Sequence, residues 1–385
     1  MWGRADIGMF SKNIDKDKIS KNLSSSAKNQ EGAFRFPHDS EVEVVFEKEE
    51  LRKQTFSPDV SIVVATRNRA KELIECVASL LKQDYENFEI IIIDDASDIN
   101  HVKTFMNYVL SLSPISKCIK YYRLKTHRGL SYCRNVGVLI ARGKIIAFID
   151  DDAIADRSWL SSLLNMFHDD KVAGVNGRII PKTTKLRRYR YSSYDQGEQV
   201  KEIPFIFQGG NCAFRKDLLL QIGLFDSKIT FGHEERELSF RLKQMGFKFL
   251  YNPDAVIYHD PPTNFLRVLK KGFKLGFSEA YIARKHSLGN VIIRCHSFKS
   301  IVFDLYLLFL ILLSPIMFFV SLILKNISLF YQLLLLITLP SLIVIIYIRM
   351  FKRMMAFSFF LSALAEKIGN IYGFLVSLKM IKKER

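Results

Sequence analysis

The chain has 385 residues, enough for about two domains, and a formal net charge of +17 at pH 7. A basic balance attracts polyanions. Because Lys and Arg crowd near the apolar C-terminal region and no compact nucleic-acid recognition motif is present, we expect anionic lipid as the partner and no nucleic acid. The five cysteines are scattered and odd in number, with no CxxC pair, which argues against a disulfide framework or a zinc site.

The N-terminal extension, residues 1–57, is polar, and we expect its first thirty or so residues to be flexible. The sequence EVEVVF at 41–46 indicates a short strand or a lead-in to the main domain. The beginning of the sequence lacks the apolar stretch of a signal peptide, which predicts a first domain that stays in the cytoplasm.

From Val60 the sequence alternates between short β-branched apolar runs, typical of buried strands, and stretches with helical spacing. The expected strands are VSIVVAT, FEIIIIDD, KYYRL and KIIAFI, and the expected helices lie at 70–83, around 101–112, at 129–143 with Gly143 as the stop, and at 158–169. This alternation predicts a mostly parallel sheet covered on both faces. Ligands in such sheets bind at the carboxyl ends of the strands.

Three aspartates, Asp150, Asp151 and Asp152, follow one of these expected strands. Adjacent like charges repel, and unpaired buried charge is costly, so the group needs a counter-charge. Hard oxygen ligands suit Mg²⁺ or Mn²⁺, either of which can bridge to the oxygens of a diphosphate. The alternative is a solvated helix N-terminus, where carboxylates are common, since Asp152 precedes the helix expected around Trp159.

Polar groups suited to a nucleotide end two neighbouring strands. Asp94 follows FEIIII and could accept hydrogen bonds from a nucleobase or a ribose, whereas the alternative is an ordinary turn residue. Thr66, Arg67 and Asn68 end the first strand, and Arg67 together with Arg134 could offset the charge of a diphosphate.

Four segments in order resemble the family 2 glycosyltransferases, which have the GT-A fold. They are VSIVVATRNRAKELIECVASLLKQDYENFEIIIIDDASD, GLSYCRNVGVLIARGKIIAFIDDD, QGGNCAFRKDLLLQIGLFD and FGHEERELSFRLKQMGFKFLYNPDAVIYHD, and the resemblance covers roughly residues 58–262. It implies an α/β domain of GT-A fold with a Rossmann-like sheet over this range.

The resemblance also implies roles for individual donor-side residues. Asp94 matches the aspartate that contacts the nucleotide base. Asp150 and Asp152 match the outer positions of the DxD motif, which holds ribose and metal, and Asp151 joins them as a nucleotide-binding residue. His259 matches a histidine that can approach the metal or the diphosphate.

On the acceptor side, Gly209, Gly210 and Asn211 match the loop that lines the acceptor and donor-sugar site, and Arg241 matches an arginine in the following helix. Glu234-Glu235 stands where the family usually has Glu-Asp, whose second member is the general base. Glutamate can perform the same proton transfer, so Glu235 is expected to be the base and Glu234 stays a candidate. A base on the acceptor side implies inversion of configuration.

The C-terminal part predicts attachment to a membrane. Residues 263–300 are basic and amphipathic, as in an interfacial helix, with an ordinary surface helix as the alternative. Residues 301–348 hold two apolar stretches of spanning length joined at Lys325-Asn326, which predicts a transmembrane hairpin, with a buried soluble hairpin as the alternative. Residues 349–385 predict an interfacial or a third membrane helix and a basic tail. Basic flanks place the catalytic domain on the cytoplasmic side of the plasma membrane.

Together these features predict a membrane-anchored, metal-dependent, inverting glycosyltransferase. It would use Mn²⁺ or Mg²⁺, take a nucleotide-diphosphate sugar such as a UDP-sugar, and act on a lipid-linked or polysaccharide acceptor. A processive polysaccharide synthase is the first alternative, although no Gln-x-x-Arg-Trp motif is present. A non-catalytic glycan-binding scaffold and a nucleotidyltransferase are the others.

Overall fold

The computed structural model describes residues 42–47, 57–112, 118–184, 195–229 and 232–261, and beyond them 271, 274–276, 278, 281–282 and 285–286. The chain divides into two compact units, Met1–Pro261 and Pro262–Arg385. Within the described residues, no helix combines the length and the apolar character that crossing a bilayer requires. The predicted hairpin at 301–348 and the tail at 349–385 lie outside the described residues, as do most of 263–300 and the first 41 residues.

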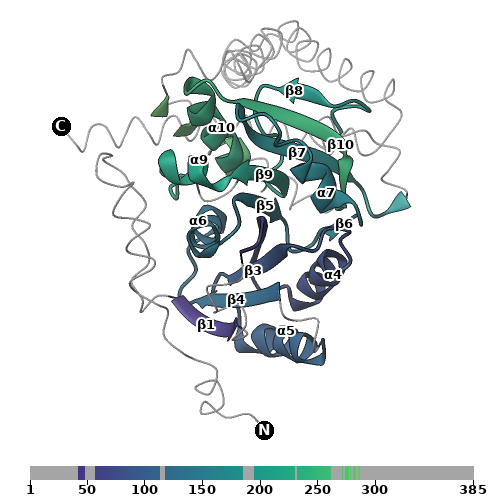
Figure 1. Cartoon of the computed structure of the whole chain (residues 1–385). Coiled ribbons are helices and arrows are strands. Elements are labelled where there is room, and N and C mark those ends of the chain that lie inside the picture. Colours follow the sequence, from purple (N-terminus) through teal and green to yellow (C-terminus); the bar gives the residue numbers. More distant parts are fainter. Residues whose placement is uncertain are drawn as a thin grey trace, which may run out of the picture. The chain divides into compact units, whose positions relative to one another are not determined.

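The first half of the sheet has the strand–helix alternation that the sequence predicts (Figure 1). Its elements are β2 (Val60–Thr66), α4 (Ala70–Leu80), β3 (Phe88–Asp94), α5 (Ile99–Ser111), β4 (Ile119–Leu124), α6 (Leu130–Ile140) and β5 (Ile145–Ile149). Strands β4, β3, β2 and β5 lie side by side and pair in parallel. Every residue of β3 and of β5 is buried, as expected of strands covered on both faces.

The second half has a different pattern. Its elements are β6 (Ile154–Ala155), α7 (Trp159–Leu164), β7 (Val172–Ile180), β8 (Lys201–Ile203), β9 (Asn211–Arg215), α9 (Lys216–Gln221), α10 (Glu234–Gln244) and β10 (Lys248–Tyr258). Strand β9 runs antiparallel to both β5 and β7, while β7 and β10 are parallel. The short strands β6 and β8 each pair antiparallel with β10.

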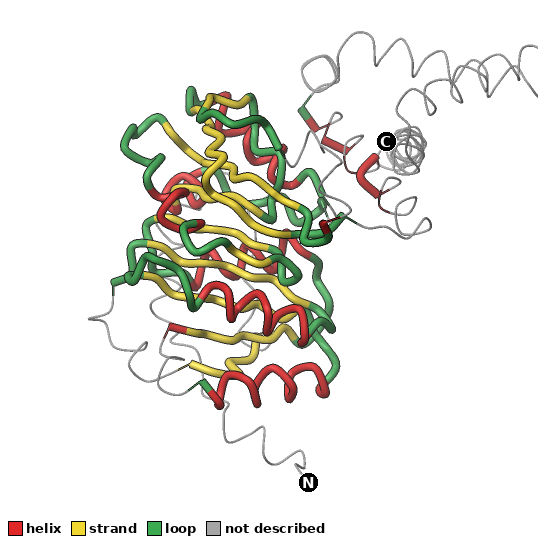
Figure 2. The backbone as a smooth tube through the Cα atoms, turned by 90° about the vertical axis from the view of Figure 1, so that its right-hand side faces the viewer, coloured by secondary structure: helices red, strands yellow, loops and turns green. Residues whose placement is uncertain are grey.

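The prediction of a mostly parallel sheet is therefore wrong for the sheet as a whole. The strand order is β1-β4-β3-β2-β5-β9-β7-β10-β6, with β8 beside β10, and Figure 2 shows these strands stacked as one sheet. Among the described strands, four pairings are parallel and five are antiparallel. Two of the antiparallel pairings come from β9, which lies between β5 and β7 and runs opposite to both, and the other three come from the edge strands β1, β6 and β8.

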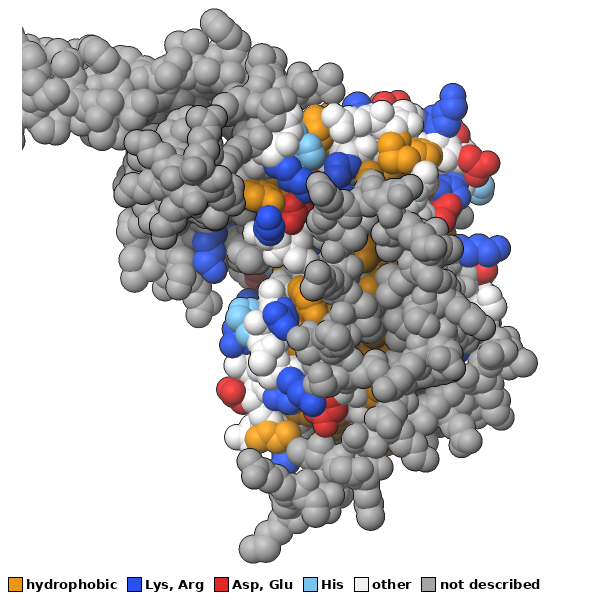
Figure 3. All heavy atoms as spheres, turned by 90° about the vertical axis from the view of Figure 1, so that its left-hand side faces the viewer, with side chains coloured by type: hydrophobic (Ala, Val, Ile, Leu, Met, Phe, Trp, Pro, Cys, Tyr) orange, Lys and Arg blue, Asp and Glu red, His pale blue; other side chains and the backbone are white. Residues whose placement is uncertain are grey.

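Helices cover both faces of the sheet. Helices α6, α9 and α10 lie on one face and α4, α5 and α7 on the other (Figure 1). On the first face the strands and helices share one buried apolar cluster, which includes Val63, Ile91, Phe148, Val136, Leu219 and Leu238. The described part of one side of the molecule carries basic, acidic and apolar side chains next to one another (Figure 3).

Two local predictions can be compared with the structure. The strand expected at 41–46 is confirmed as β1 (Val42–Glu47), which pairs antiparallel with β4 at the edge of the sheet. The helix expected to stop at Gly143 instead ends at Ile140, with Ala141 as its C-cap. Glycine is required at position 143 for a different reason. A Cβ there would lie 2.5 Å from the backbone nitrogen of Ser61, so only glycine allows this close approach to β2.

Candidate active site

The acidic cluster lies at the carboxyl ends of the parallel strands, where the topology predicts a ligand site. Asp150, Asp151 and Asp152 follow β5, and Thr66 ends the neighbouring strand β2. The Thr66 hydroxyl donates a hydrogen bond of 2.8 Å to Asp151, which is buried. The hydrogen bond from Thr66 therefore fixes Asp151 in its buried position, whereas Asp150 and Asp152 are only partly buried.

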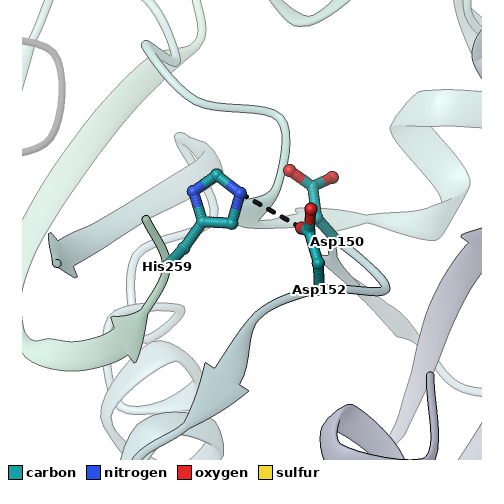
Figure 4. A group of neighbouring side chains, drawn as sticks. All are labelled: Asp150, Asp152 and His259. Carbon is teal, nitrogen blue, oxygen red and sulfur yellow. Dashed lines mark ion pairs between the residues drawn. The ribbon is translucent and has the colours of Figure 1, made fainter. Parts of the chain in front are cut away.

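His259 completes a group that could hold a metal ion. Asp150, Asp152 and His259 each offer one ligand atom, and these atoms lie within 4.8 Å of one another (Figure 4). His259 Nε2 lies 3.1 Å from Asp152 Oδ1. The backbone N–H of His259 donates to the carbonyl of Ile180, so the pairing of β10 with β7 fixes the histidine beside an aspartate from β5.

The donor set fits a divalent cation. Two carboxylate oxygens and one imidazole nitrogen are ligands that divalent ions accept, and they do not discriminate between Mg²⁺ and Mn²⁺. Burial would raise the pKa of Asp152, but the hydrogen bond from His259 and the charges of His259 and Arg69 lower that pKa to about 2. Asp152 is thus an anion at neutral pH, as metal ligation requires.

Arg69 contacts this cluster although the sequence did not single it out. Its Nη1 atom lies 2.6 Å from Asp152 Oδ2 and 3.1 Å from Asp151 Oδ1, and its side chain is half exposed. Arg67, which was expected to offset a diphosphate, is exposed and lies two residues earlier. The sequence offered one signal for Arg69: it directly precedes the helix expected from residue 70, and it is the N-cap of α4 in the structure.

A second group of charges surrounds Arg134 of α6. Its Nη1 donates to Glu234 Oε1 at 2.5 Å, and its Nη2 lies 3.5 Å from Asp150 Oδ1. The side chain is 4 % exposed and lies over the rings of Phe148 and Phe225. Arg134 thus connects the aspartate cluster to the first turn of α10.

The two glutamates at the start of α10 have different surroundings. Both are buried, but only Glu234 is paired with Arg134. No hydrogen bond or ion pair with another side chain in the described part of the chain engages the Glu235 carboxylate, which accepts a hydrogen bond from its own backbone N–H. Burial, and then the charge of Glu234, raise the pKa of Glu235 to about 8, although Arg134 acts to lower it. A carboxylate with a pKa near neutrality is suited to accept a proton.

The backbone just before these glutamates is strained. His233 occupies the N-cap of α10 with a φ of 66°, in the left-handed region that non-glycine residues seldom adopt. Such outliers persist where the surrounding structure holds them, often at functional sites. Here the turn directs both glutamates, in the first turn of α10, into the buried region around Arg134.

The glycine loop before β9 closes over these groups. A Cβ on Gly209 would lie 2.5 Å from Arg134 Nη1, and a Cβ on Gly210 would lie 2.1 Å from Asp150 Oδ2. Both glycines are buried and permit this close approach. The sequence placed them beside the sugar site, and the structure brings them against Arg134 and Asp150.

Asn211, expected in the same loop, is a buried structural contact. Its Oδ1 accepts a hydrogen bond from Trp159 Nε1 at 2.8 Å, and its Nδ2 donates to the carbonyls of Arg178 and Ala255. The side chain is fully buried. These bonds join α7, β7 and β10 beneath the glycine loop, so Asn211 positions the loop.

Asp94 and Asp95 at the end of β3 are also buried and already hydrogen-bonded. Asp94 accepts from the backbone N–H of Ser97 at 2.6 Å and from the hydroxyl of Tyr121. Asp95, which the sequence did not assign, accepts from the backbone N–H groups of Arg128 and Gly129, with His127 Nδ1 2.6 Å from its Oδ2. The two carboxylates therefore organise the loops at this strand end.

Two further predicted residues have contacts of their own. Asn68, exposed, accepts from the backbone N–H of Asp98 at 2.7 Å and so ties the end of β2 to the start of α5. Arg241 donates to Glu237 and to the carbonyls of Ile222 and Leu224. Its described contacts thus hold α10 against the end of α9, and none of them reaches the acidic cluster.

Comparison with known protein families agrees with this arrangement. The description "Glycosyl transferase family 2" matches residues 61–223, and "Glycosyl transferase family group 2" matches residues 145–365, more than half of the chain. The chain belongs to glycosyl transferase family group 2. It is a glycosyltransferase that uses a nucleotide-sugar donor, with a GT-A-like α/β fold built on a mixed sheet.

Relatives of known activity are distant. A glucosyl-dolichyl phosphate glucuronosyltransferase of Haloferax volcanii is 26% identical over 243 residues, which is 57% of this chain and 76% of that protein. A chondroitin synthase of Escherichia coli is 29% identical over 254 residues, 55% of this chain and 36% of that protein. The chain thus spans little more than a third of the second relative.

Among solved structures, a mannosyltransferase of Pyrobaculum calidifontis in complex with GDP-Man and Mn²⁺ is similar, with a TM-score of 0.49 and 21% sequence identity. The match covers 60% of this chain and 65% of that one.

Proposed function

We propose that this glycosyltransferase inverts the anomeric configuration, with Glu235 as the general base and a divalent cation held by Asp150, Asp152 and His259. The observation that carries the proposal is that one site contains both groups: the possible ligands lie within 4.8 Å of one another, and Asp150 is linked through Arg134 to the start of α10. A leaving diphosphate and an attacking hydroxyl would thus each have a suitable partner.

The chemistry divides between the two ends of this site. The acceptor hydroxyl attacks the anomeric carbon and gives its proton to the Glu235 carboxylate, while the bond to the diphosphate oxygen breaks and that oxygen keeps the electron pair. Attack opposite the leaving group inverts the configuration. Arg69, half exposed beside Asp152, is placed to pair with the departing phosphate. The cation, when bound, supplies positive charge against the leaving diphosphate.

We propose a lipid-linked acceptor and attachment to the cytoplasmic face of the plasma membrane. The Haloferax volcanii relative, whose name contains a dolichyl phosphate, supports such an acceptor because the match covers most of its length. The basic amphipathic sequence of 263–300 and the apolar stretches of 301–348 support contact with anionic lipid and anchoring by a hairpin. UDP-sugars are the first donors to examine.

Elongation of a polysaccharide is the second candidate function, favoured by the likeness to chondroitin synthase. The two functions differ in the number of sugars that one acceptor gains. A single addition to a polyprenyl-phosphate-linked sugar, measured by mass spectrometry, supports the first candidate, and a ladder of products supports the second.

The test of the mechanism is a screen of nucleotide sugars with the full-length protein in Mn²⁺ or Mg²⁺, followed by NMR of the product. We expect nucleoside diphosphate release that depends on the cation, an inverted anomeric centre, and loss of transfer by about 10²- to 10⁴-fold in Glu235→Gln. A product with retained configuration would exclude the inverting mechanism, and an unimpaired Glu235→Gln would exclude this base.

A further inference from the structure

Arg134 is a buried cation placed between the two carboxylate groups of the site. One nitrogen of its guanidinium contacts Glu234 at 2.5 Å, and the other lies 3.5 Å from Asp150. Its position is fixed on the remaining sides, because the rings of Phe148 and Phe225 lie beneath it and Gly209 leaves no room above. With its side chain only 4 % exposed, Arg134 offers little surface to a ligand. Its described hydrogen bonds are with charged side chains of the site.

The two neighbouring glutamates consequently have unequal partners. Glu234 accepts a hydrogen bond from Arg134 with Oε1, and its other oxygen, Oε2, is buried without a hydrogen bond. The Glu235 carboxylate has no side-chain partner among the described residues and accepts a hydrogen bond only from its own backbone N–H. The groups that act on it are Glu234 and Arg236 of α10, Arg134 of α6 and Cys212 of β9, and Asp150 lies beyond Arg134. Burial and Glu234 oppose ionisation of Glu235, whereas the two arginines favour it.

We propose that Arg134 is a positioning residue: it holds Glu234 as the fixed anion of an ion pair, which leaves Glu235 as the proton acceptor, and it links this base to Asp150 on the donor side. The inference rests on the proposed function of Glu235 as the base. In the transfer step the proton goes from the acceptor hydroxyl to Glu235, and neither Arg134 nor Glu234 gains or loses one.

This arrangement predicts opposite effects for the two partners of a single ion pair. Replacing Glu234 by Gln removes the adjacent negative charge and frees the charge of Arg134 to act on Glu235, so Glu235 should ionise at lower pH. Replacing Arg134 by Gln removes a positive charge that favours the ionised form, so Glu235 should ionise at higher pH. If the ion pair only stabilised the fold, the two replacements would not change the pKa of Glu235 in opposite directions.

The experiment is the pH profile of kcat/KM for the full-length protein and for Glu234→Gln, Arg134→Gln and the double variant. We expect the rising limb of Glu234→Gln to move to lower pH by about one unit or more, that of Arg134→Gln to move to higher pH, and the double variant to lie between them. Arg134→Lys, which keeps the charge, should restore the position of the limb. Equal loss of activity at every pH, with an unmoved limb, would overturn the proposal.

Arg215→Gln is the matched control. Arg215 is less buried than Arg134 but likewise lies over a ring, that of Phe167, and it donates to the carbonyls of Val172 and Phe167 outside the site. Its replacement should lower stability without moving the limb. If Arg134→Gln fails to fold, Glu234→Gln and Arg134→Lys still decide the question, because their predicted limb positions differ.

A measurement without turnover separates this inference from the proposed function. The side-chain carboxyl of Glu235 can be titrated by NMR in protein labelled with ¹³C-glutamate, its resonance being the one that disappears in Glu235→Gln. Opposite displacements of that titration in Glu234→Gln and Arg134→Gln support the inference even if no donor is turned over. A lack of turnover would contradict only the proposed function. An active enzyme whose Glu235 titration is unmoved by both changes would overturn the inference alone.

Discussion

The two halves of the sheet build their share of the site in different ways. From β2 to β5 the strands alternate with helices and are parallel, so their carboxyl ends meet and the polar residues after them lie close together. From β7 to β10 the strands are mixed in direction, and side chains such as Asn211 hold the loops together. Parallel topology thus brings the strand ends of the first half together before any side chain is bonded, whereas the second half needs contacts such as those of Asn211 to place its loop.

The two halves of the sheet both contribute residues to the acidic cluster. Asp150 and Asp152 come from the first half and His259 from the second, and Arg134 and Glu234, which are 100 residues apart, form another contact between the halves. Changes at these contacts should affect catalysis, whereas changes within one half should affect mainly stability.

The largest effect is expected from Asp152→Asn, which keeps the shape of the side chain and removes its charge. Loss of a cation ligand removes several kcal/mol of charge stabilisation, so turnover should fall on the order of 10³-fold. Mn²⁺ affinity, measured by calorimetry without donor, should weaken as well, and also in His259→Ala from the other half. The control is Asp156→Asn, four residues further on, which contacts Ser158 and should leave Mn²⁺ affinity unchanged. An unchanged affinity in both cluster variants would show that the halves do not share a cation.

A large loss of stability without a change in the site is expected from Lys120→Met. Lys120 and Glu89 form a fully buried ion pair of 2.8 Å between β4 and β3, and Glu89 also accepts from Ser61 of β2. Leaving Glu89 buried without its cation should cost about 3–5 kcal/mol in the free energy of unfolding, measured by denaturant titration. The double variant Lys120→Met/Glu89→Gln should recover part of this loss. Weakened Mn²⁺ binding in folded Lys120→Met would contradict the separation of stability from the site.

The sequence predicted the first half better than the second for the same physical reason. Apolar runs such as Val60–Thr66 and Phe88–Asp94 specify strands locally, and parallel pairing then brings their ends together. The antiparallel insertion of β9 depends on contacts far along the chain and leaves no local pattern. Arg69 was missed although the helix start expected at residue 70 was correct, because its contact with Asp152 joins segments 83 residues apart in the sequence.

The resemblance to a family supplied the acceptor-side residues but not their surroundings. It pointed to Glu234 and Glu235 together, and the unequal partners of the two became visible only with Arg134 in place. It also pointed to Asn211, whose three hydrogen bonds beneath the loop could not be inferred from the neighbouring glycines.

A moderate effect is expected from Gly210→Ala in the loop that joins the halves. The added Cβ would lie 2.1 Å from Asp150 Oδ2, so the loop or the aspartate must move, at a cost of about 1–3 kcal/mol in stability and with weaker Mn²⁺ binding. Gly137→Ala in α6 is the control, because its Cβ would meet Val63 in the core at 2.4 Å. It should lower the melting temperature while the folded protein keeps its Mn²⁺ affinity. Equal Mn²⁺ affinity in wild type and Gly210→Ala would count against a role of this loop in placing Asp150.

The smallest effect is expected from Asp260→Asn. Asp260 follows His259 and accepts from the backbone N–H and the hydroxyl of Thr183, at 2.9 and 2.6 Å, in an exposed contact between the segments after β10 and β7. Its loss should cost about 1 kcal/mol or less in the free energy of unfolding. Thr183→Val should have a similar effect, and the double variant should be less destabilised than the sum of the two. Strict additivity would indicate that the two residues do not act together.

The edge strand β1 has a practical consequence for producing the catalytic unit. A fragment that began at Pro58, where the family resemblance begins, would lack Val42 and Val44, which are buried against β4. The backbone of β4 would then be an open edge beside a newly exposed apolar surface, the arrangement that promotes aggregation between chains. Fragments that start upstream of Val42 should therefore yield more soluble, monodisperse protein than fragments that start at residue 58.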